Sequence, residues 1–123
     1  MFNTLKLLFI GNIALIHLYA SGNESLLFHG NCTTCHYETQ TISAPSVVEF
    51  KRVYREAFTK KEDFVEHMAK WVQYPDPKTA LMPKAIKKHG LMPELGFDLE
   101  TLKSISSYIY DTNFTKSHEG HSN

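Results

Sequence analysis

The two cysteines of this 123-residue chain, Cys32 and Cys35, are three positions apart, and His36 follows them directly. Residues three apart in a helical turn point to the same side, so both sulfurs and the imidazole can meet at one place. Because no further cysteine exists, the chain is not a disulfide framework. The fold must therefore present one compact group of two thiols and an imidazole in its N-terminal third.

The pattern CTTCH at residues 32–36 predicts the covalent attachment of one haem c. In such a site each sulfur forms a thioether with one vinyl group, and the adjacent histidine lies under the iron. A thioredoxin-like redox pair also uses this cysteine spacing, but it needs a preceding strand, and the sequence predicts none. A zinc site needs a second compact cluster of ligands, and the other close histidine pair, His118 and His121, lies in the C-terminal tail.

We expect residues 1–21 to be a secretory signal peptide. One basic residue precedes an apolar stretch that Asn12 and His17 interrupt. A membrane-spanning helix needs roughly 20 apolar residues, so an uncleaved membrane anchor is the less favoured alternative. The small residues Ala20, Ser21 and Gly22 each offer a cleavage position. Export predicts a periplasmic location, where a cysteine pair is not kept as free thiols.

The charges balance at 13 basic and 13 acidic residues. Proteins that bind nucleic acid normally have a basic excess, so we expect no nucleic-acid partner. The length predicts one domain over residues 22–114, followed by a flexible tail at 115–123, with the chain loose from Asn113 onward. A domain of this size buries little apolar surface, so a cofactor that joins its core is stabilising.

Apolar residues recur at a spacing of three to four, which predicts an all-α fold without strands. Capping residues, prolines and glycines set the expected helix ends. The expected helices are one that leads through Phe28 to Cys32, one from Ser46, one that Thr59 caps and that ends before Pro75, one over Pro83–His89 that Gly90 ends, and one that Asp98 caps.

Over residues 23–112 the chain resembles the class I monohaem cytochromes c. Members of that family have an aromatic residue four positions before the first cysteine, where this chain has Phe28. They have a proline nine residues after the haem histidine, the position of Pro45, and a Met-Pro step before the C-terminal helix, as at Met92. One position departs from the family, because Glu24 stands where a glycine is common.

The resemblance implies four to five short helices around one haem, with His36 as the proximal iron ligand. In the family the proline carbonyl accepts a hydrogen bond from the imidazole, a role that falls to Pro45. Trp71 resembles a family tryptophan whose indole N–H donates to a haem propionate, and a core aromatic bonded to a backbone carbonyl is the alternative. Four apolar side chains are expected to form the core together with the porphyrin: Phe28, Leu102, Ile105 and Ile109.

The two Met-Pro steps offer a sixth iron ligand. A thioether favours ferrous iron, and a proline after the methionine keeps that methionine out of a helix, which suits a ligand on a loop. Met92 lies six residues before the Asp98 cap, as in the family, so we expect Met92, with Met82 as the alternative. Histidine ligation through His67 or His89 is a further alternative.

With both axial positions filled, the iron has no open site for a substrate, so the resemblance implies a one-electron carrier and not an enzyme. We expect a monomer that meets redox partners through short-lived interfaces and has no membrane contact beyond its export signal. Lys84, Lys87 and Lys88 would steer an acidic partner, and a solvated helix face is the alternative. Two other functions stay open, a cytochrome subunit of a larger dehydrogenase or oxidase complex and a ligand-binding or peroxide-handling haem protein.

Overall fold

The computed structural model describes residues 23–116, and within that range the chain is helical and has no strand, which confirms the all-α prediction. The expected signal peptide and the histidines of the tail lie outside the described residues. The elements follow one another as α2 (Asn23–Leu27), its π-helical continuation η2 (Phe28–Cys32), α3 (Val47–Ala57), α4 (Lys61–Gln73), α5 (Pro83–His89) and α6 (Leu99–Asp111).

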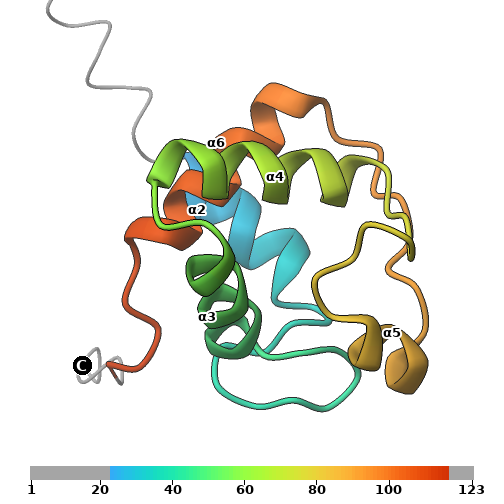
Figure 1. The fold of residues 1–123 in the computed structure, drawn as a ribbon. Coiled ribbons are helices and arrows are strands. Elements are labelled where there is room, and N and C mark those ends of the chain that lie inside the picture. The colour runs from blue at the N-terminus through green and yellow to red at the C-terminus, as the bar shows by residue number, and fades with distance from the viewer. Residues whose placement is uncertain (1–22, 117–123) are drawn as a thin grey trace, which may run out of the picture.

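The last helix holds the others together. α6 packs along α4 and also against α2, and α3 packs against both α4 and α6 (Figure 1). In Figure 1, α5 lies apart from this group, within the long loops that connect α4 to α6. No helix within residues 23–116 has the length and apolar character needed to cross a membrane.

The core lies where α2, α3, α4 and α6 meet. Phe28, Phe64 and Val47 are the largest side chains that are fully buried. The side chains expected in the core are all buried, namely Phe28, Leu102, Ile105 and Ile109. The sequence therefore identified correctly which faces of the first and last helices turn inward.

The C-terminal segment stays packed further than expected. Phe114 is 5% exposed, and its ring lies 5.3 Å from that of Phe28 and under the ammonium of Lys51. The prediction of a loose chain from Asn113 onward was therefore wrong at Phe114, and residues 117–123 lie outside the described residues. α6 ends at Asp111, so Phe114 lies beyond the helical stripe that periodicity detects, and the chain turns back to bury it.

Local signals set several helix ends. The Ser46 hydroxyl accepts from the backbone N–H of Glu49 at 3.2 Å, and Gly90 ends α5 with φ +89°. The N-cap position of α4, in contrast, lies one residue after the predicted cap: it is Lys60, which forms no side-chain bond there. The prediction of Thr59 as this cap was wrong, because the acidic residues Glu62 and Asp63 in the first turn already favour the positive end of the helix.

Candidate functional site

One cavity of about 360 Å³ is bounded by the motif turn, by α3, α4, α5 and α6, and by the loops on both sides of α5. Its volume lies in the range of small-molecule and cofactor pockets, roughly 300–1,000 Å³. All the residues predicted to hold the cofactor line it, although they are spread over sixty positions of the sequence. They are Cys32, Cys35, His36, Pro45, Trp71, Met82 and Met92.

His36 is oriented by the chain that follows it. Its Nδ1 lies 2.7 Å from the carbonyl oxygen of Pro45, so the expected hydrogen bond is present. A carbonyl only accepts, so Nδ1 carries the proton and the lone pair of a neutral ring lies on Nε2. Burial lowers the pKa of His36, the Pro45 bond opposes this and the nearby His89 adds to it, so the ring favours its neutral form. The imidazole is therefore prepared to act as a ligand through Nε2.

The motif forms a tight turn at the end of η2. The backbone N–H groups of Cys35 and His36 both donate to the Cys32 carbonyl, at 3.3 and 2.9 Å. Burial raises the pKa of the Cys32 thiol to about 11, so this thiol stays protonated near neutral pH. A catalytic redox cysteine needs the opposite shift, toward the thiolate. The site therefore lacks the electrostatic feature of a thioredoxin-like pair.

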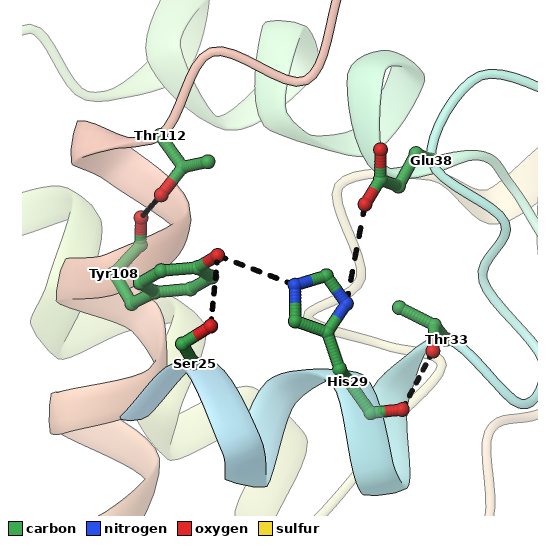
Figure 2. Close-up of polar contacts among 6 residues, drawn as sticks. All are labelled: Ser25, His29, Thr33, Glu38, Tyr108 and Thr112. Carbon is green, nitrogen blue, oxygen red and sulfur yellow. Dashed lines mark hydrogen bonds and ion pairs between the residues drawn. The ribbon is translucent and has the colours of Figure 1, made fainter. Parts of the chain in front are cut away.

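Side chains on both sides of the motif fasten it to α6 (Figure 2). The Tyr108 hydroxyl on α6 accepts from Ser25 at 3.3 Å and lies 3.4 Å from Nε2 of His29. On its other side, Nδ1 of His29 lies 3.9 Å from a carboxylate oxygen of Glu38. His29 precedes the motif and Glu38 follows it, so this chain of contacts holds the turn from both ends. Sequence analysis assigned no such role to His29 or Tyr108, because their pairing spans 79 residues.

Phe50 and Tyr54 are two further wall residues; the sequence predicts Tyr54 as core or pocket wall, and Phe50 only as part of the apolar stripe of its helix. Phe50 lies edge-on to the His36 ring, with 5.1 Å between centroids and 82° between planes. Tyr54 follows one turn later on the same face of α3, and both side chains line the cavity. Their four-residue spacing directly after Pro45 is the signal that connects them to the site.

The candidate distal ligands come from the two ends of α5. Met82 occupies the N-cap position, and Met92 lies in the loop after Gly90, and both are half-buried on the cavity wall. His89 lines the same wall, whereas His67 is not part of it, because its ring stacks on Phe58 at 4.1 Å. The geometry therefore keeps Met92, Met82 and His89 as candidates and leaves out His67.

Trp71 lines the cavity through its ring, but its N–H points elsewhere. The indole Nε1 donates to the backbone carbonyl of Asp76 at 2.9 Å. An indole has one hydrogen to donate, so the bond to a propionate suggested by the family resemblance is not the arrangement found. The alternative of an aromatic wall residue bonded to a backbone carbonyl describes Trp71 correctly.

The lysines of α5 differ from those of α4 and α6. Lys84, Lys87 and Lys88 are exposed, and no carboxylate of residues 23–116 lies within ion-pair distance of them. On α4 and α6 the lysines instead pair with carboxylates of the same molecule. Three exposed leucines line the cavity next to these unpaired lysines: Leu81, Leu91 and Leu95.

Comparisons with protein-family models, with curated proteins and with solved structures each found no match. Within residues 23–116, no three His, Cys, Asp or Glu side chains gather as a group that could hold a metal ion.

Proposed function

We propose that this protein is a monohaem c-type cytochrome, exported to the periplasm, that carries one electron at a time between redox partners. One observation carries the proposal. The CTTCH turn and both Met-Pro steps converge on a single cavity, although the motif and the second step are nearly sixty residues apart. A separate structural role for each of these features would not bring them to the same wall.

The chemical character of the cavity-lining residues suits a haem, as their positions do. No Asp, Glu, Lys or Arg side chain lines it, so an apolar ring would meet no uncompensated charge. The two thiols of Cys32 and Cys35 would hold the group by thioethers, and the Nε2 lone pair of His36 would bind one axial position. Met92, or Met82 as the alternative, would bind the other. When bound, a haem supplies an iron that changes its charge by one electron.

Side chains and backbone groups of the protein would set the reduction potential of the iron. The Pro45 carbonyl fixes the orientation of His36 and raises the basicity of the imidazole. A methionine sulfur favours the ferrous iron and raises the reduction potential, and the apolar wall acts in the same direction by excluding water. If His36 and a methionine both bound the iron, no position would stay open for a substrate, and the bound group would serve electron transfer rather than catalysis.

The partner surface belongs to the same proposal. The exposed leucines line the cavity, where an electron would enter or leave, and the unpaired lysines belong to α5, the helix between these leucines. Positive charge there would speed the encounter with an acidic redox protein, and the effect would weaken with salt. We propose a monomer that forms such complexes transiently.

Spectroscopy of the exported protein tests this function. The reduced protein is expected to keep its colour in the polypeptide after extraction with acidified organic solvent, and its spectrum is expected to stay unchanged under carbon monoxide. Covalent haem with ready carbon monoxide binding would instead indicate a ligand-binding or peroxide-handling protein. Recovery in a fixed ratio with a larger enzyme would indicate a subunit of a dehydrogenase or oxidase complex.

A further inference from the structure

The cavity wall contains several polar side chains, and most of them are already bonded to the backbone. Apart from the thiols, two exceptions stand out, Tyr54 and His89, for which no hydrogen bond is found within residues 23–116. The other polar side chains of the wall donate to nearby backbone carbonyls at 2.7–3.3 Å: Asn31, His36, Ser43, Trp71 and Ser106.

Tyr54 is the more deeply enclosed of the two exceptions. Its side chain is 7% exposed, and its ring packs against Phe58 and Phe64 at 6.1 and 5.9 Å between centroids. Within residues 23–116 no fully buried side-chain polar atom lacks a hydrogen-bond partner, so the Tyr54 hydroxyl must reach open space. Since the residue is otherwise enclosed and lines the cavity, that space is the cavity.

The position of Tyr54 along α3 places this hydroxyl away from the cysteines. α3 begins against the motif loop, where the backbone N–H of Val47 donates to the Tyr37 carbonyl at 2.9 Å. Phe50 contacts the His36 ring, and Tyr54 lies one further turn along the helix, about 5.4 Å of rise. A ring attached at the motif and lying along this wall would therefore present its far edge to Tyr54.

The hydroxyl is a donor at any physiological pH. Burial raises the pKa of Tyr54 to about 12, so the phenol stays protonated. An O–H that donates to an ionised acceptor forms a shorter and stronger bond than one between neutral groups. With no Lys or Arg side chain on the cavity wall, a carboxylate at this edge depends on such a donor.

We propose that the Tyr54 hydroxyl donates a hydrogen bond to a carboxylate on the far edge of the tetrapyrrole and so fixes how the ring sits in the cavity. The inference rests on the proposed function. Tyr54 is a positioning residue in this account, since it contacts the cofactor without binding the iron. His89 is half-buried at the end of α5 and belongs to the distal side, with Met82 and Met92.

The substitution Tyr54→Phe in the haem-loaded protein tests the proposal, because it removes the hydroxyl and keeps the ring contacts. The measurement is the reduction potential as a function of pH. Loss of a donor to an ionised carboxylate is expected to raise the pKa of that carboxylate by roughly one to two units. The pH at which its protonation changes the reduction potential should rise by the same amount. Tyr110→Phe is the matched control, because Tyr110 also packs on Phe64 but does not line the cavity.

A second measurement uses the unaltered protein and so does not depend on the stability of a variant. Proton NMR of the ferrous form is expected to show a slowly exchanging Tyr54 hydroxyl proton close to the carboxylate-bearing chains of the ring. An unchanged pH profile in Tyr54→Phe, or a shift produced by His89→Gln in its place, would overturn the inference. A chain that carries no covalent haem would instead overturn the proposed function itself.

Discussion

The two sides of the cavity are built differently. On one side, α6 packs directly against α4 and α2, and it contributes Leu102, Ile105 and Ile109 to the buried wall. On the other side, α5 contains no buried residue, and its lysines form no ion pair with the described part of the chain. The first side is held by contacts within the protein. The second side has few such contacts, and it carries both candidate sulfur ligands, so we infer that the occupant of the cavity helps to hold it.

Removal of the two cysteines of the proposed covalent attachment is expected to have the largest effect and to separate the two sides. In Cys32→Ala/Cys35→Ala, amide hydrogen exchange over residues 83–97 should accelerate by roughly tenfold or more, while α4 and α6 keep their protection. Thr34→Ala, inside the same turn, is the control. Equal loss of protection on both sides would show that the wall of α4 and α6 is not independent of the cofactor.

Loss of the distal ligand is the next largest effect. Met92→Leu is expected to abolish the iron–sulfur charge-transfer band, lower the reduction potential and allow carbon monoxide to bind, because a thioether stabilises ferrous iron. Met68→Leu, which alters a buried methionine of α4 on the same wall, is the matched control. If Met82→Leu alone removes the band, Met82 is the ligand and the assignment to Met92 fails.

A substitution in the core next to α6 should lower the stability of the fold more than it changes the reduction potential of the haem. Phe114→Ala removes a buried ring from the contact with Phe28 and is expected to destabilise the fold by about 3–5 kcal/mol. Thr115→Ala, at an exposed neighbouring position, is the control. Denaturant unfolding measures the change, and a loss no larger than that of the control would mean that this segment is not part of the core.

The smallest expected effect concerns the start of α6. Hydrogen bonds from the hydroxyl and the backbone N–H of Thr101 lower the pKa of the Asp98 carboxyl. A lowered pKa in the folded state stabilises the fold above the unfolded value of about 3.9, and this contribution disappears as the pH falls through the folded pKa. Asp98→Ala should therefore lower Tm by a few degrees at pH 7 and by less in strong acid.

The exposed Glu94→Ala serves as the control for that comparison, because Glu94 lies in the loop before α6. The prediction concerns the difference in Tm between wild type and Asp98→Ala. An equal difference at neutral and acid pH would mean that ionised Asp98 does not contribute to the cap.

Prediction from the sequence succeeded where the determining signal is local. Pro83 at the first position and Gly90 after the last define α5, and Asp98 at the N-cap defines the start of α6. The motif and the Pro45 contact are likewise separated by only nine residues. Such features depend on neighbouring residues, so the order of residue types is sufficient to predict them.

Prediction from the sequence failed where a contact depends on the path that a loop takes between helices. The burial of Phe114 requires the segment after α6 to turn back onto Phe28. The indole of Trp71 finds the Asp76 carbonyl because of the loop path after α4, and helical periodicity does not describe that path. The open hydroxyl of Tyr54 depends on which backbone carbonyls the other polar groups of the wall reach, and the order of residue types does not predict those partners.

The mass of the intact exported protein under denaturing conditions tests the central claim most directly. The account predicts the mass of the chain without its leader plus one haem, which remains attached after the fold is lost because two thioethers hold it. A protein with the bare polypeptide mass, free of colour and with both thiols reactive, would contradict the account.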